Sequence, residues 1–284
     1  MTALTQAKFK EKPRIKVTGS FYYMMLSLIA VVMIFPFVYT ILSSFKLEEQ
    51  INQIPPVWIP NPFTLNNYQL VFKRIDIGRL YLNSFAIATT VTIGSVYLSS
   101  LAGYVLAKFN FRGRNFVFWF ILASMMIPGP VILVPWYQLC VAFHMINNYA
   151  GVIVPCLVWN YGIFLLMQFM HTIPNELLDA GRIDGASELQ IYHQIIFPNI
   201  LPAVSALGIF TFLSMWDMFL WPLIILLDQK LYTLPIGLAS FSGQWWTDIG
   251  PTLAGSTLAI IPVLIVFLIF QRNITEGVTL TGLK

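Results

Sequence analysis

Long uninterrupted apolar runs constrain this chain more than any other feature of its sequence. They lie at residues 21–42, 82–107, 116–139, 150–170, 200–227 and 253–270. Each is close to or above the roughly 20 residues that an α-helix needs to cross the hydrocarbon core of a bilayer. Backbone groups cannot bond to water inside lipid, so runs of this length should be helices rather than loops or open strands. We predict an all-α integral membrane protein with six transmembrane helices.

The composition agrees with a membrane environment. The 284 residues are 57% hydrophobic and 10% charged, whereas a soluble domain has roughly 25% charged residues. The net charge of +4 comes from scattered basic residues, so the bilayer is an expected partner and nucleic acid is not. Cys140 and Cys156 lack the spacing of a metal or redox pair, and no metal site is expected.

Lysine and arginine predict the orientation, because they are more abundant in cytosolic loops. With a cytosolic amino terminus, eleven of the sixteen lie inside: Lys8, Lys10, Lys12, Arg14, Lys16, Lys108, Arg112, Arg114, Arg182, Arg272 and Lys284. The external side then holds Lys46, Lys73, Arg74, Arg79 and Lys230. Six spans place both termini in the cytosol. We predict a single transmembrane domain over residues 1–284, with cytosolic segments at 1–20, 171–198 and 271–284.

One cytosolic segment is unusually acidic. Residues 175–198 read NELLDAGRIDGASELQIYHQIIFP and contain one arginine against Glu176, Asp179, Asp184 and Glu188. Pro174 and Asn175 predict a helix start. Ser187 and Gln190 have the spacing of a capping box, which predicts a second helix leading toward the membrane.

Two glycines are expected on one face of the first of these helices. Leu178, Gly181, Gly185 and Leu189 follow one another at helical spacing. Glycine costs about 1 kcal/mol in a helix relative to alanine, so the pair indicates close contact with a partner. Asp179 and Arg182 are spaced to form an ion pair. The segment is either a docking element that transmits a partner's motion or an ordinary amphipathic surface helix.

The same segment resembles the EAA loop of type I ATP-binding-cassette importer permeases. That pattern is E-A-A, two residues, D-G-A, eight residues, then I-x-L-P. The first triplet corresponds to Asp179, Ala180 and Gly181, the second matches Asp184, Gly185 and Ala186, and the end matches Ile195 and Pro198 with Phe197 for leucine. The resemblance implies that residues 179–189, with Arg182, Glu188 and Leu189, form a coupling helix that docks on an ATPase subunit.

Further segments resemble the carbohydrate branch of this family, similar to the smaller permease of maltose-type transporters. They are FTLNNY, LYLNSF, WDMFLWPLI, TLPIGLASFSGQ and FQRNITEGVTLTGLK. The resemblance implies a second homologous permease, two ATPase subunits that bind ATP and Mg²⁺, and an extracellular or periplasmic solute-binding protein. It implies import of a carbohydrate by alternating access across the bacterial cytoplasmic (inner) membrane. Glycerol-phosphate and polyols are alternative substrates in the same branch.

The carboxyl tail is a second region where the resemblance implies contact with a partner. In maltose-type transporters this tail reaches between the ATPase subunits. By analogy, the candidate contacts in this chain are Gly277, Thr281 and Lys284.

Three residues are candidates for the translocation path. Asp217 lies inside an apolar run, where a carboxylate costs roughly 2.5–3.5 kcal/mol and should face the bundle interior, a water-filled path or a polar partner. The family usually places asparagine here, so a buried structural network is the alternative to pore contact. Trp216 and Trp221 could stack on a sugar, although Trp221 is also placed to anchor a helix at the membrane interface.

The third apolar run is expected to be a bent helix. It contains the sequence MIPGPVILVP, and proline interrupts helical hydrogen bonding. The prolines are Pro128, Pro130 and Pro135.

No catalytic site is expected. His144, His171 and His193 are not at ligand spacing, and the chain lacks a GxxxxGK[ST] phosphate loop. We therefore expect no cofactor in this chain and assign ATP hydrolysis to other chains. A self-sufficient secondary transporter is the rival class, but it should have inverted repeats or several intramembrane ionisable groups. A membrane-embedded enzyme would need clustered His, Asp or Glu at one membrane face.

Overall fold

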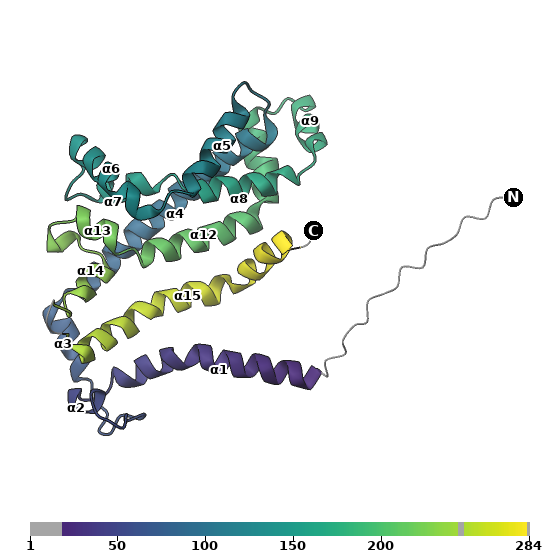
Figure 1. Ribbon diagram of the computed structural model, residues 1–284. Helices are drawn as coiled ribbons and strands as arrows, with labels where there is room; N and C mark the ends of the chain where they lie inside the picture. The colour runs from purple at the N-terminus through teal and green to yellow at the C-terminus, as the bar shows by residue number, and fades with distance from the viewer. Residues whose placement is uncertain (1–18, 244–246, 283–284) are drawn as a thin grey trace.

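The computed structural model describes the backbone of residues 19–243 and 247–282 and the side chains of residues 21–243 and 247–271. Figure 1 shows a bundle of helices with α1 along one edge. The elements of the first half are α1 (Gly19–Ser43), α2 (Glu48–Ile51), α3 (Asn66–Arg74), α4 (Ile77–Lys108), α5 (Arg114–Met125), α6 (Gly129–Ala142), α7 (Tyr149–Cys156) and α8 (Asn160–His171). Those of the second half are α9 (Asn175–Ile183), α10 (Glu188–Ile191), η1 (Tyr192–Ile196), α11 (Phe197–Asn199), α12 (Leu201–Trp216), α13 (Leu220–Ile225), η2 (Gln229–Leu231), α14 (Leu234–Ala239) and α15 (Ile249–Gly282).

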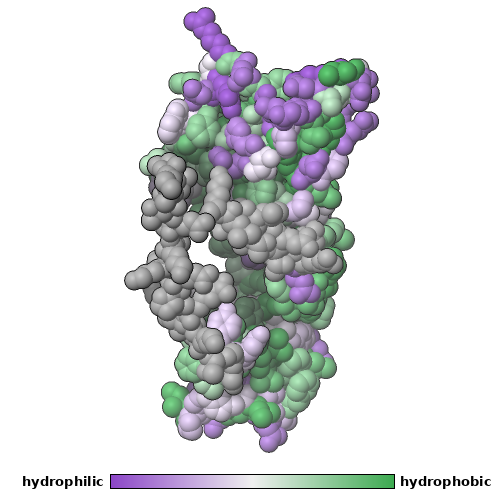
Figure 2. Space-filling model, turned by 90° about the vertical axis from the view of Figure 1, so that its right-hand side faces the viewer, coloured by the Kyte–Doolittle hydropathy of each residue, from purple (hydrophilic) through white to green (hydrophobic). Residues whose placement is uncertain are grey.

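Six spans account for the long helices. Four segments are long and apolar enough by themselves: α1, α4, the α7–α8 segment and the first part of α15. Two more spans are bent pairs, α5 with α6 and residues 188–199 with α12. The predicted all-α membrane fold is confirmed, with six spans when each bent pair counts as one. On the face that Figure 2 shows, hydrophilic residues gather at the two ends and hydrophobic residues lie between them, as a bilayer requires.

Two predicted spans differ from the structure. The third is broken rather than gently bent, because α5 and α6 meet at 108°. Pro128 follows the last turn of α5, whose final N–H groups bond three residues back, from Met126 to Ala123 and from Ile127 to Ser124, and proline cannot continue the helical ladder. The fifth ends at Trp216 instead of reaching residue 227. Pro222 has no N–H to donate to Met218, so an unbroken helix would leave that carbonyl unpaired.

Helix α4 is the centre of the bundle and makes its most extensive contacts with α8 and α12. The residues it buries include several small ones: Ser84, Ala88, Ser95, Ser99 and Gly103. A Cβ atom at Gly103 would lie 3.0 Å from the backbone nitrogen of Met167 on α8, and one at Gly162 would lie 2.9 Å from Oγ of Ser99. Small residues at these positions let the α4 and α8 backbones approach closely, as in other membrane helix pairs.

Helix α1 is attached to the rest of the described chain mainly at one end. None of the residues in its most apolar window is buried, and Figure 1 shows it set apart from α4 and α12. The attached end is the carboxyl end of α1, where Lys46 is 1% exposed and donates to Oγ of Ser43 over 2.8 Å. The Asn67 amide donates to the carbonyl oxygens of Ser44 (2.9 Å) and Lys46 (2.8 Å). These bonds fix the chain just after α1 and leave the helix itself uncovered.

Replacing Gly103 by valine should destabilise the α4–α8 contact. Because the new Cβ faces backbone atoms of α8 that cannot rotate away, we expect an overpacking cost of about 1–3 kcal/mol. Gly129→Val is the matched control, since nothing lies within 4 Å of a Cβ at Gly129. The measurement is the midpoint of thermal unfolding of the purified protein. Equal midpoints for the two variants would contradict the close approach described above.

Candidate functional site

The acidic segment folds as a short helix that ends at a glycine. As predicted, α9 begins directly after Pro174. At its other end, the N–H of Ala186 bonds to the carbonyl of Gly181 (3.0 Å) and that of Gly185 to the carbonyl of Arg182 (3.1 Å). Gly185 has a φ of 81°. This pair of bonds around a left-handed glycine is the Schellman motif, which stops a helix.

The expected coupling helix over residues 179–189 is therefore wrong in its boundaries. Gly185 lies beyond the end of α9, and Leu189 belongs to α10. The capping box at the start of α10 is confirmed, with Ser187 and Gln190 as predicted. Gly181 is buried, and a Cβ there would meet Ile195 at 3.0 Å and Ile191 at 3.2 Å. The bare face of this glycine serves packing within the chain.

Charged side chains tie α9 and α10 to the end of α4. Arg182 pairs with Asp179 (2.8 Å), as predicted, and its Nε donates to Glu188 (2.8 Å). The hydroxyl of Tyr104 on α4 donates to the other carboxylate oxygen of Glu188 over 2.9 Å. The hydrogen bond with Glu188 and the pairing with Asp179 hold the pKa of Arg182 above its ordinary value. The loop is thus linked to α4 by a continuous chain of bonds.

A second link joins the beginning of the segment to the same end of α4. The ammonium group of Lys108 donates to Oδ1 of Asn175 over 3.0 Å and to the carbonyl oxygen of Ile173. Tyr104 and Lys108 are one helical turn apart on α4. One turn of α4 therefore holds the start of α9 directly, through Lys108, and its end indirectly, through Glu188 of α10 and Arg182.

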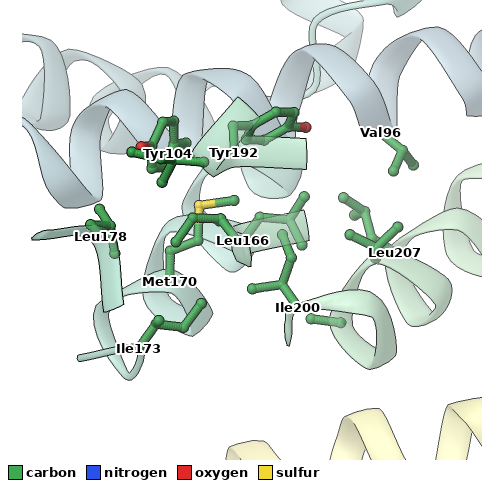
Figure 3. Packing of buried hydrophobic residues seen from close by; sticks show 13 residues of the cluster. Val96, Tyr104, Leu166, Met170, Ile173, Leu178, Tyr192, Ile200 and Leu207 are labelled. Atoms are coloured by element: carbon green, nitrogen blue, oxygen red, sulfur yellow. The ribbon is translucent and has the colours of Figure 1, made fainter. Parts of the chain in front are cut away.

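Hydrophobic packing adds to these bonds on the inner side of the segment. Figure 3 shows Leu178 of α9 near Tyr104, Met170 and Ile173, in the cluster that also holds Tyr192 and Leu166. Tyr192 is fully buried, begins the π-helical turn η1 and hydrogen-bonds to Ser100 of α4. A π-helical turn at this place was not predicted, because its signature is an irregular hydrogen bond rather than a residue pattern.

The outer side of the segment is uncovered and apolar. Ile183 is 86% exposed, Leu189 63% and Leu177 44%, and Ala180 is also exposed. Figure 1 shows α9 at one end of the bundle, outside the packed helices. Large exposed apolar side chains on a polar, firmly held element are typical of a protein interaction surface. We call Leu177, Ala180, Ile183 and Leu189 the docking face.

A cavity of about 300 Å³ lies where helices are interrupted inside the membrane region. The residues that line it include those at the break between α7 and α8 and those at the end of α12. Its lining is mostly apolar, with two indole rings and two hydroxyl groups: Trp136, Pro155, Cys156, Val158, Trp159, Thr211, Ser214, Met215 and Met218. None of these residues was predicted to line a cavity, although Pro155 inside an apolar run is a signal for such a break.

The candidate path residues have different positions. Asp217 ends α12, is exposed and lines a second cavity of about 600 Å³ between α12, α14, α15 and Phe37 of α1. Its carboxylate accepts no hydrogen bond from any group that the structure describes, so the described chain supplies no structural network for it. Trp216 (2% exposed) donates to Ala259, and Trp221 (3% exposed) donates to Gly151. Both indoles are therefore largely buried, although Trp216 borders the same cavity as Asp217. Their stacking on a sugar stays a prediction.

The carboxyl-terminal candidates lie at the limit of the structure. Helix α15 continues to Gly282, so the backbone of Gly277 and Thr281 extends the sixth span and does not form a separate tail. The side chains of both residues and all of Lys284 lie outside the described residues. Their contact with an ATPase subunit stays a prediction.

The bundle is that of an all-α membrane protein with an exposed apolar face at one end. Residues 96–279 match the family described as binding-protein-dependent transport system inner membrane component. The chain belongs to this family. It is 36% identical over 259 residues to the arabinooligosaccharides transport system permease protein AraQ of Halalkalibacterium halodurans, covering 90% of this chain and 93% of the relative. It is 30% identical to the sn-glycerol-3-phosphate transport system permease protein UgpE of Escherichia coli O1:K1, covering 90% and 94%.

A solved structure has the same fold. A chain from a bacterial ABC transporter involved in the import of the acidic polysaccharide alginate matches with a TM-score of 0.80, at 19% identity, over 92% of this chain and 99% of that one. A chain of a bacterial alginate ABC transporter in complex with alginate pentasaccharide-bound periplasmic protein matches with a TM-score of 0.63, at 12% identity, over 92% and 96%. The predicted resemblance to ATP-binding-cassette importer permeases is confirmed.

Gly185→Ala should loosen the docking segment. An L-residue at a φ of 81° costs about 1–2 kcal/mol, so we expect faster amide hydrogen exchange in residues 181–188. Gly185→Asn is the control, because asparagine tolerates the left-handed region better and serves at helix ends. The expected cost comes from the backbone conformation and not from a steric clash, since nothing lies within 4 Å of a Cβ at Gly185. Unchanged exchange in the alanine variant would be incompatible with the Schellman geometry.

Proposed function

We propose that this chain is one of two permease subunits of an ATP-driven, binding-protein-dependent importer that carries a carbohydrate across the bacterial inner membrane. The observation that carries the proposal is the docking face, held on α4 yet uncovered on its outer side. The chain itself performs no chemistry in this proposal. Two partner ATPase subunits bind ATP and Mg²⁺ and drive the change between inward and outward openings.

The docking face suits an ATPase subunit because it offers apolar contacts from a rigid support. Exposed Ile183 and Leu189 supply buried area on binding. The bonds from Tyr104 and Lys108 connect any displacement of α9 to a helix that spans the membrane. In this proposal the α9 end faces the cytosol, together with both chain termini. The opposite end receives the solute-binding protein.

A second permease suits the uncovered surfaces inside the membrane region. Helix α1 is not buried by the described chain, and the Asp217 cavity lies between α1 and the bundle. A carboxylate without a partner is costly in lipid, so this surface favours a polar or water-filled interface over lipid. Half of the translocation path would therefore lie along α12 and α15, with the other half supplied by the second permease.

An oligosaccharide is the substrate that these observations favour. Among the relatives, AraQ is named for arabinooligosaccharides and the alginate transporter for a polysaccharide. The cavity near Trp136 and Trp159 offers aromatic faces for sugar C–H groups and hydroxyls from Thr211 and Ser214. The cavity near Trp136 and the cavity that contains Asp217 are both lined without lysine or arginine. This favours a neutral sugar over glycerol-phosphate, which the relative UgpE is named for.

Replacing Ile183 by aspartate should prevent ATPase docking. Its side chain is 86% exposed on the docking face, and a charge there would have to be desolvated at the interface. We expect the ATPase to be lost when the tagged chain is purified in mild detergent, while the second permease is retained. Ile59→Asp is the control, at a 72% exposed isoleucine in the connection between α2 and α3. If the wild-type chain purifies without partners and transports when reconstituted alone, the importer proposal is wrong and the chain is a secondary carrier.

Trp159→Ala should slow transport without releasing the partners. If the indole contacts the passing sugar, its loss should lower uptake by about tenfold, which corresponds to about 1.4 kcal/mol of lost interaction. Trp119→Ala is the control, because Trp119 lies on α5 with 66% exposure, away from the cavity. Uptake of labelled oligosaccharide by reconstituted importer is the readout. Equal uptake by the two variants argues against a sugar path through this cavity.

A further inference from the structure

A cavity of about 360 Å³ lies between the ends of α4, α5 and α8, on the side of the bundle that carries α9. Its lining has a polar part and an apolar part. The polar residues are Arg114, Asn115, Gln168 and His171, and the apolar ones are Leu106, Phe118 and Met167. Helix α5 packs against α8 at this place, so the cavity is formed by neighbouring spans rather than by a loop.

The cavity is lined by Arg114 and by no acidic residue. Arg114 donates from Nε to the carbonyl of Leu106 (2.7 Å) and from Nη1 to Oδ1 of Asn110 (3.2 Å). These neutral acceptors orient the guanidinium without cancelling its charge, and none of the ion pairs among the described residues involves Arg114. The sequence contains no Asp or Glu between Asp76 and Glu176. Arg112 adds positive charge in the same connection, and so does Lys108, whose charge is partly balanced by Glu176 at the start of α9.

The depth of the cavity matches the border between lipid and water. Helices α4 and α8 end here, at Lys108 and His171, and α5 begins here, at Arg114. No residue of α5 is buried by the described chain. Phe116 (76% exposed) and Phe120 (66%) lie on the face of α5 that is turned away from the lining residues Arg114 and Phe118, and lipid tails would cover them there. The surface of α5 beside the cavity is therefore open to lipid.

We propose that this cavity binds the phosphate-bearing head group of an anionic phospholipid from the cytosolic leaflet. Basic pockets between membrane helices on that side are suited to anionic head groups. The Arg114 guanidinium is the principal contact, because its planar fork matches phosphate oxygens. Asn115 and Gln168 supply amide donors, and Leu106, Phe118 and Met167 contact the first acyl carbons. This site does not depend on the proposed transport function, since any membrane role of the chain would place it against lipid.

The test is native mass spectrometry of the complex extracted from its membrane, with phosphatidylglycerol as the probe. Wild type should retain the lipid, and Arg114→Gln should reduce its retention by about tenfold. Arg112→Gln is the matched control: it removes the same charge from the same connection at a residue outside the cavity lining. It should change retention by less than twofold. Equal losses in the two variants would overturn a defined site in favour of diffuse attraction.

Two further arms keep the outcome decisive. Arg114 also bonds to Leu106 and Asn110, so its replacement could disturb the fold. Gln168→Leu is a second variant, because the Gln168 side chain makes no hydrogen bond to the described chain. It should reduce lipid retention by a few-fold. Excess inorganic phosphate should not displace the lipid; full displacement would identify a free-anion site instead. A photo-crosslinking residue at position 115 should label lipid. Labelling of a protein chain there would overturn the proposal and assign the cavity to a subunit interface.

Discussion

The close approach of α4 to α8 is the contact on which the rest of the bundle depends. Inside a membrane, an apolar side chain gains nothing by leaving lipid for another apolar helix, so contact area and fit must supply the stability. Gly103 and Gly162 allow that fit by removing side chains where the two backbones are nearest. At the same end of α4, Tyr104 bonds to Glu188 of α10 and Lys108 bonds to the carbonyl oxygen of Ile173, just after α8. The docking face is in place only because these two helices are.

The sequence was informative wherever one local pattern has one structural meaning. The apolar runs predicted the spans, Pro174 the start of α9, and Ser187 with Gln190 the second helix. It was misleading at Gly185, because a glycine four residues after Gly181 fits both a helix face and a helix end. Only the left-handed φ separates the two. The docking contact itself stays a prediction.

Inside the membrane region, hydropathy could not separate buried from exposed aromatic residues. Trp216 and Trp221 are packed in the core, whereas Trp119 is exposed, although all three lie in apolar runs. In water, burial follows from hydrophobicity, but in lipid both faces of a helix are apolar. Prolines predicted where the third span is interrupted, yet not its 108° bend. A missing hydrogen bond permits a break, and the neighbouring helices set its angle.

Helix α4 also has a mechanical property that follows from its two ends. Near one end it holds α9 through Tyr104 and Lys108. Near the other, the Asn83 amide donates to the carbonyls of Lys230 and Tyr232 (2.9 Å each) in the loop before α14. With 32 residues, α4 is about 48 Å long. It is one uninterrupted helix that bonds to other segments near both of its ends. A tilt of α4 at one side of the membrane would therefore move the segments bound to it at the other side, with no loop between them.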